Sequence, residues 1–161
     1  MIIAGALLLM LTENISVLGA FFQSVSARTA GFYTYPLGKF TNAGRIVMIV
    51  LMFIGASPGS TGGGIKTTTF FVLLQGIKSA ATNRSEKAFR YSVPANAFRK
   101  ASVILLMGLT IVLTGSFIMS ALEPGIDMSD ILFEITSAFG TTGLSTGITG
   151  SLTTGSKILS I

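Results

Sequence analysis

The groups best able to do chemistry in this chain belong to its backbone, because its side chains offer little. The 161 residues include six acidic and eleven basic side chains, but no histidine and no cysteine. Ser–His and Cys–His nucleophile pairs are therefore excluded, and so are His/Cys metal sites. We expect no enzyme activity, no catalytic residue and no cofactor.

Two short segments rich in Thr and Gly are candidates for binding a cation through carbonyl oxygens. They read RTAGFYT and GTTGLST, and each follows an apolar stretch, 16–27 or 130–139, too short to cross a bilayer. Non-helical backbone within a membrane is tolerated where protein buries it or where it lines a water-filled path. Rings of carbonyls can replace the hydration shell of K⁺. Gly31 and Gly143 would supply backbone angles that other residues resist. The alternative is an extracellular turn.

A duplication relates these two segments. An offset of 112 residues aligns six identical pairs without a gap: Phe21 with Phe133, Thr29 with Thr141, Gly31 with Gly143, Thr34 with Thr146, Gly38 with Gly150 and Thr41 with Thr153. The shared order around a Thr-x-Gly centre favours a repeat over coincidence. Each copy has an apolar segment, a short helix, a turn and another apolar segment.

A third candidate is the stretch GASPGSTGGGIKTTT, residues 55–69. It is similar to a phosphate-binding loop, but Ile65 separates Gly64 from Lys66, whereas that loop requires Lys directly after Gly. We interpret residues 55–64 as the break in a membrane helix, with an outer half over 43–56 and an inner half over 66–78. A packing patch of small residues is the alternative. We interpret Lys66 as an interfacial anchor.

The elements that would position these segments are membrane helices. Half of the residues are hydrophobic, mean hydropathy is +0.75, and 11% are charged, against about 25% in soluble domains. Residues 101–122 are uncharged, and 22 residues at about 1.5 Å each cover a hydrocarbon core of about 30 Å. The pI is near 9.9, but no basic face is visible in the sequence, so we do not expect nucleic acid as a partner. We expect the lipid bilayer as the partner of these helices.

The charges predict an orientation. Six of the eleven bases lie between Lys78 and Lys100, opposed only by Glu86. Short basic loops stay in the cytoplasm, so residues 101–122 would run outward and deliver Glu123, Asp127 and Asp130 to the external side. Lys39 and Arg45 run against this rule.

Together the three motifs closely resemble the ion-translocating membrane subunit of the Trk/Ktr/HKT potassium transporters, and the bacterial KtrB type most of all. The resemblance implies an all-α integral membrane fold of helix–pore loop–helix repeats, with re-entrant pore helices and a broken second helix. It covers nearly the whole chain. Residues 1–78 would be the third repeat with its first helix truncated, 79–100 a basic cytoplasmic linker, and 101–161 the fourth repeat with its last helix truncated.

The resemblance also assigns site residues. The ion filter would comprise Thr29, Ala30, Gly31, Phe32, Thr141, Thr142, Gly143 and Leu144, with K⁺ held by their backbone carbonyls. The gating loop would comprise Gly55, Ser57, Gly59, Ser60, Thr61, Gly62, Gly63 and Gly64.

The expected function is therefore K⁺ uptake across the plasma membrane by a multi-pass protein, through a carbonyl-lined filter gated by a Gly-rich intramembrane loop. By resemblance, the complete subunit would be a homodimer regulated by a cytosolic nucleotide-binding ring, with K⁺ as the transported ion and Na⁺ as a candidate coupling ion in a symport. The alternatives are another re-entrant-loop cation channel and a non-conducting membrane packing subunit. Ion flux would separate these.

Overall fold

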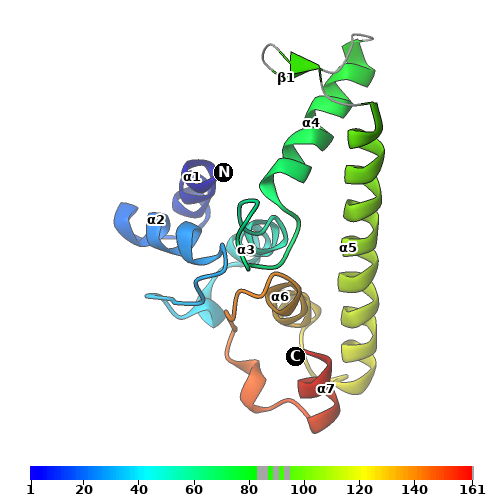
Figure 1. Ribbon diagram of the computed structural model, residues 1–161. Helices are drawn as coiled ribbons and strands as arrows, with labels where there is room; N and C mark the ends of the chain where they lie inside the picture. The colour runs from blue at the N-terminus through cyan, green and yellow to red at the C-terminus, as the bar shows by residue number, and fades with distance from the viewer. Residues whose placement is uncertain (83–86, 89–90, 93–94, 161) are drawn as a thin grey trace.

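The computed structural model describes residues 1–82, 87–88, 91–92 and 95–160, and this part of the chain is almost entirely helical (Figure 1). The α-helices are α1 (Ile2–Thr12), α2 (Val17–Ser26), α3 (Asn42–Phe53), α4 (Thr67–Thr82), α5 (Ala95–Leu122), α6 (Met128–Phe139) and α7 (Thr154–Leu159). Two 3-10 turns, η1 (Leu37–Lys39) and η2 (Ile148–Gly150), complete the helical elements of this part. The strands β1 (Lys87–Ala88) and β2 (Tyr91–Ser92) form a two-residue antiparallel pair. The helical fold class is confirmed for the described residues; part of the expected linker 79–100 lies outside them.

Helix α5 has the length and composition of a membrane span. Within the described ranges it is the one helix that meets both requirements, over Asn96–Leu122, with a mean hydropathy of 2.2 in its most apolar window. Only 22% of that window is buried, and large apolar side chains such as Leu106 and Phe117 are 63% and 74% exposed. An apolar helix with so little protein around it suits a lipid environment.

A non-helical stretch separates two helices where the sequence predicts a break. α3 ends at Phe53 and α4 begins at Thr67, within a few residues of the two halves expected from the sequence. The Ile65 backbone N–H donates to the Phe53 carbonyl at 2.9 Å, so the intervening chain leaves and returns at nearly the same point. α3 ends where Ile54 leaves the helical region, with φ −87° and ψ 80°. Within the stretch that follows, Gly59 and Gly64 have φ angles of +85° and +73°, which residues with a Cβ resist.

The two short apolar stretches also fold as helices. Residues 16–27 contain α2, whose N-terminus is capped by the Ser16 hydroxyl accepting from the Gly19 N–H, and 130–139 fall within α6. In Figure 1, α3 and α6 lie between the α1–α2 pair and α5. The main core draws on both copies of the repeat, and its fully buried members include Leu9, Met48, Met52, Phe133 and Leu144.

Matching hydrogen bonds support the duplication. The Thr41 hydroxyl caps α3, and the Thr41 backbone N–H donates to the Glu13 carboxylate. Thr153 lies 112 positions later: its hydroxyl caps α7, and its backbone N–H donates to the Glu123 carboxylate. The basic side chains at the equivalent positions also bond equivalent carbonyls: Arg45 bonds Gly38 at 2.8 Å, and Lys157 bonds Gly150 at 3.4 Å. Equivalent threonines and bases thus make similar local contacts, although Glu13 and Glu123 are 110 and not 112 positions apart.

Arg45 also joins the two copies. Its guanidinium lies 3.0 Å from the Asp130 carboxylate and donates to the Ser129 hydroxyl. Arg45 is one of the two bases that run against the charge rule, and in the structure its charge is paired with an acid of the second copy.

Candidate functional site: paired Thr-x-Gly turns over a glycine-rich loop

The first turn follows α2 directly. After Ala27 the chain leaves the helix, and Thr29 and Gly31 both have a φ of +76°. The Ser26 hydroxyl donates to the Phe32 carbonyl across the turn. Left-handed angles are ordinary for glycine but uncommon for a β-branched residue such as threonine. The turn is therefore held in a sparsely populated conformation by its surroundings.

The second turn repeats this geometry after α6. Thr141 has a φ of +50° and Gly143 a φ of +79°, at the positions equivalent to Thr29 and Gly31. The Thr142 N–H donates to the Ser137 carbonyl at 2.9 Å, which folds the chain back over the helix end. The glycine angles were expected from the sequence; the threonine angles were not.

The two turns touch. A Cβ built on Gly31 would lie 2.5 Å from the Thr142 carbonyl oxygen, so no other side chain fits there without a shift of the backbone. Exposure differs between the turns: Ala30 and Phe32 are exposed, whereas Thr142 and Leu144 are buried. The two groups of four expected filter residues are thus in contact at Gly31 and Thr142.

The glycine-rich loop lies against both threonines. The Gly63 N–H donates to the Thr141 hydroxyl at 2.6 Å, and the Gly64 N–H donates to the Phe139 carbonyl at 3.2 Å. A Cβ on Gly62 would lie 2.7 Å from a methyl carbon of Thr29. Glycine is needed here because the loop backbone approaches the turns more closely than a side chain allows. Gly55 and Gly63 also approach each other within the loop.

Two basic side chains bind carbonyls of this loop. Arg28 donates to the Gly55 carbonyl at 2.8 Å, and the Lys66 ammonium donates to the carbonyls of Ser60 and Gly62. Our interpretation of Lys66 as an interfacial anchor stays a prediction, and these hydrogen bonds are a contact that the sequence did not reveal. The broken helix leaves carbonyls without helical partners, and a nearby ammonium satisfies them.

The other expected loop residues lie further from the turns. Ser57, Gly59, Ser60 and Thr61 are exposed, and the Ser57 carbonyl accepts from both the N–H and the hydroxyl of Ser60. The loop therefore has a contacting half around Gly62–Gly64 and an exposed half around residues 57–61.

Glu134 is a residue that the sequence reading missed. Its side chain is 94% buried in α6, at a relative exposure of 6%. The carboxylate accepts from the Ser145 hydroxyl, from the Thr146 N–H at 3.2 Å and from the Thr149 hydroxyl at 3.3 Å. It therefore holds the segment that leaves the second turn, beside a cavity of about 410 Å³. An acid in the middle of the apolar stretch 130–139 was the available signal, because such a group needs partners.

This arrangement can present carbonyl oxygens to a cation, and it offers little for bond-making chemistry. Among the described residues no group of three Asp, Glu, His or Cys side chains is placed to hold a metal ion. The available ligands are the backbone oxygens of the two turns, which suit alkali cations. The described part of the chain is therefore of the all-helical class, with a candidate site made of backbone groups.

Comparison with protein families identifies the family of the chain. The family described as "TrkH: Cation transport protein" matches residues 5–161. The chain therefore belongs to the TrkH family of cation transport proteins, which are transporters and not enzymes.

Individual relatives agree with this assignment. The chain is 38% identical over 152 residues to Ktr system potassium uptake protein B of Vibrio alginolyticus, covering 94% of this chain and 33% of that protein. It is 38% identical over 137 residues to Ktr system potassium uptake protein D of Bacillus subtilis, covering 84% and 30%. It is 35% identical over 156 residues to the potassium/sodium uptake protein NtpJ of Enterococcus hirae, covering 93% and 34%. The chain thus spans about a third of the length of these relatives.

Proposed function

We propose that the complete protein takes up K⁺ across the plasma membrane, and that residues 29–32 and 141–144 form two sides of its selectivity filter. The observation that carries this proposal is the matched pair of turns. Two segments 112 positions apart adopt the same left-handed Thr and Gly angles and lie against each other. Cation transport is the family's activity, and potassium is named in the relatives above. Na⁺ remains a candidate coupling ion, since one relative is named for both ions.

The proposed pore belongs to the complete protein, not to these two turns alone. Gly31 and the Thr142 carbonyl are in contact, so two turns leave no space between them for an ion. A carbonyl ring needs further segments to surround the ion. We therefore propose that this chain supplies the third and fourth helix–pore loop–helix repeats, with 1–78 and 101–161 as the repeats and 79–100 as a cytoplasmic linker. α2 and α6 would be their re-entrant pore helices.

The glycine-rich loop is the proposed gate. It lies directly against the two turns through Gly62, Gly63 and Gly64. Arg28 and Lys66 place two positive charges on its carbonyls, and such charges oppose the passage of a cation. Because the loop has no helical hydrogen bonds, it can move without unfolding a helix. A cytosolic nucleotide-binding ring acting on a homodimer is the proposed source of that movement.

Ion uptake by the complete transporter tests this proposal. The experiment uses potassium-depleted cells without other K⁺ uptake systems and measures initial K⁺ and Na⁺ uptake, normalised to the amount of transporter in the membrane. In Gly31→Ser and Gly143→Ser, strain of about 1 kcal/mol or more would turn the carbonyls away from the ion. We expect the preference for K⁺ over Na⁺ to fall in both. The loss should be larger for Gly31→Ser, because its side chain would also meet the Thr142 carbonyl.

Gly125→Ser is the matched control. Gly125 lies between α5 and α6 with nothing within 4 Å of a built Cβ, so its substitution should leave uptake and selectivity unchanged. Unaltered selectivity in both filter variants would mean that the turns are ordinary connections. Absence of any flux in the unaltered transporter would favour the packing-subunit alternative.

A further inference from the structure

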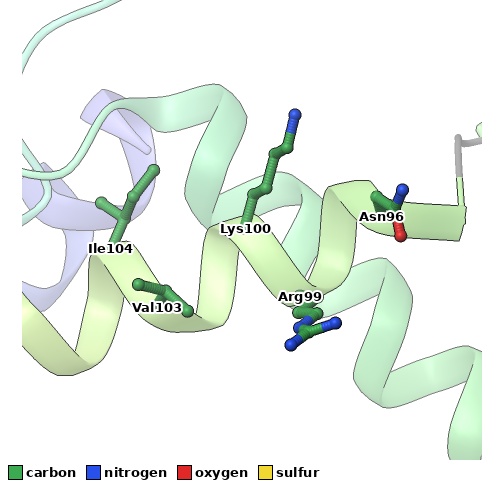
Figure 2. Close-up of a pocket in the computed structure, with 5 residues that line it drawn as sticks. All are labelled: Asn96, Arg99, Lys100, Val103 and Ile104. Atoms are coloured by element: carbon green, nitrogen blue, oxygen red, sulfur yellow. The ribbon is translucent and has the colours of Figure 1, made fainter.

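A basic hollow lies at the start of α5, away from the filter and the loop. Among the described residues it is lined by Asn96, Arg99, Lys100, Val103 and Ile104, and it encloses about 520 Å³ (Figure 2). Its polar members lie toward the beginning of the helix and its apolar members follow along the same side (Figure 2). The hollow therefore combines a positive end with an apolar end.

No acidic side chain of this part of the chain opposes those charges. Residues 87–122 contain no Asp and no Glu, so Arg99 and Lys100 have no carboxylate partner within α5. The start of a helix adds a further partial positive charge from its free N–H groups. The charge of the hollow is thus complementary to an anion.

The apolar end continues along the helix. A second hollow of about 320 Å³ shares Val103 with the first and is lined by Val103, Leu106, Met107, Thr110 and Ile111. The Thr110 hydroxyl donates to the Leu106 carbonyl at 2.8 Å and is therefore satisfied within the helix. Together the two hollows form what we call the α5 groove, with bases at one end and hydrocarbon side chains along the rest.

The α5 groove faces away from the rest of the described chain. Val103 and Ile104 are 49% and 47% exposed, whereas Ala101 and Val112, on the other side of the helix, are 4% and 6% exposed. From Arg99 to Ile111 the helix rises about 18 Å at about 1.5 Å per residue. That rise is close to one leaflet of a hydrocarbon core about 30 Å thick.

We infer that the α5 groove binds an anionic phospholipid of the inner leaflet. The phosphate-bearing headgroup contacts Arg99, Lys100 and the Asn96 amide, and one acyl chain lies along Val103, Met107 and Ile111. Basic pockets at the cytoplasmic ends of membrane helices suit such headgroups. This inference rests on the membrane orientation in the proposed function, but not on K⁺ conduction.

Native mass spectrometry of the complete transporter, titrated with phosphatidylglycerol or phosphatidylcholine, tests the inference. We expect phosphatidylglycerol to bind more tightly than phosphatidylcholine of the same chain length. Removing both charges in R99Q/K100Q should weaken phosphatidylglycerol binding about thirtyfold and leave phosphatidylcholine binding unchanged. Soluble glycerol phosphate should not compete, because it lacks the acyl chain.

Two further variants separate the groove from general surface charge. Lys78→Gln removes one exposed lysine from the neighbouring helix α4 and should have much less effect than Lys100→Gln. Met107→Trp fills the apolar end without changing charge; Met107 is 60% exposed, so folding should persist while lipid binding weakens.

Several outcomes would overturn the inference. These are equal binding of the two lipids, equal losses in Lys78→Gln and Lys100→Gln, or unchanged lipid binding in R99Q/K100Q. In the last case, a loss of regulatory-ring binding would indicate that a protein occupies this surface. Measuring K⁺ uptake in the same preparations keeps the two proposals distinct, since lipid binding is detected whether or not the protein conducts.

Discussion

At the scale of single residues, the most informative feature is the backbone conformation of Thr29 and Thr141. Both adopt left-handed angles, although nearby glycines could take such angles at lower cost. Their side chains contact the glycine-rich loop, Thr141 through a hydrogen bond to Gly63 and Thr29 through a close approach to Gly62. The strained backbone therefore lies where the two turns meet the glycine-rich loop, and such strain is common at functional sites.

Glu134 gives a test at this scale. Replacing it by alanine leaves two hydroxyls and one backbone N–H without their buried acceptor, at a cost of about 3 kcal/mol. We expect Glu134→Ala to lower the melting temperature of the purified complete transporter and to reduce its K⁺ selectivity, with Glu134→Gln intermediate. Asp127→Ala, an exposed acid whose side chain does not cap α6, is the control and should melt normally. Unchanged melting of Glu134→Ala would show that this carboxylate does not hold the turn.

At the scale of elements, the most informative feature is the non-helical stretch between α3 and α4. The sequence contains five glycines and one proline between positions 55 and 64, which no stable helix tolerates. The freed backbone groups find partners in Thr141, Arg28, Lys66 and the end of α6. Because this segment has no helical hydrogen bonds and its part from Ser57 to Thr61 is exposed, that part can move without unfolding a helix.

Shortening this segment tests its gating role. Deleting residues 60–63 removes the contacts with both threonines while leaving α3 and α4 intact, so initial K⁺ uptake should rise several-fold and depend less on the regulatory ring. Uptake into potassium-depleted cells, normalised to membrane protein, measures both effects. Ser57→Ala, in the exposed half of the loop, should behave as the unaltered protein. A normally inserted deletion variant whose uptake falls, or stays dependent on the ring, contradicts the gate.

A second prediction for the elements concerns pH. Glu123, just after α5, accepts from the N–H of Thr153 and from the hydroxyl of Ser156 at the start of α7. These hydrogen bonds, first that of the Thr153 backbone, lower the pKa of Glu123 below its ordinary value of 4.5. A lowered folded-state pKa contributes stability that is present above pH 4.5 and lost as the pH falls through the folded value.

Glu123→Gln should therefore be less stable than the unaltered protein at pH 7, with the difference in stability shrinking below pH 4.5. Thermal unfolding of the two proteins across that range is the measurement, and a constant difference would rule out this contact as its source.

At the scale of the whole molecule, the two copies of the repeat share one core. The basic residues at the start of α5 and the acidic residues that follow it lie at opposite ends of that helix. Phe133 and Leu144 of the second copy pack with Leu9, Met48 and Met52 of the first, and Arg45 pairs with Asp130 across the copies. In Figure 1, the beginning and end of α5 lie at opposite extremes of the molecule. A helix of 28 residues, about 42 Å long, separates those extremes by more than a hydrocarbon core.

This separation predicts topology. In a complete transporter without other cysteines, Ala80→Cys at the end of α4 should react with an impermeant thiol reagent only from the cytoplasm. Gly125→Cys, after α5, should react only from outside, and both positions are exposed. Labelling intact cells and inside-out vesicles distinguishes the two sides. The reverse pattern would invert the orientation, and labelling of both sites from one side would mean that α5 does not cross.

The amino-acid sequence by itself predicted the helical class, the repeat, the non-helical stretch between α3 and α4, and the left-handed angles of Gly31 and Gly143. Each of these depends on local properties: apolar content, spacing, and the steric freedom of glycine or the rigidity of proline. The offset of 112 residues remained visible because equivalent turns need the same small residues in the same order. The expected helix boundaries lie within four residues of the observed ones, except at α5, which begins at Ala95, six residues before the expected span 101–122 and within the expected linker 79–100.

Only the tertiary structure decided what those pieces contact. Four features depend on neighbours that folding brings together. They are the hydrogen bonds of Lys66 to loop carbonyls, the bond of Arg28 to Gly55, the bonds of Glu134 to the second turn and the left-handed angles of the threonines. Gly63 and Thr141 are 78 residues apart in the chain and 2.6 Å apart between bonded atoms. The residues around Gly63 and Thr141 do not predict this contact, because the free energy that favours it comes from packing the two copies into one core.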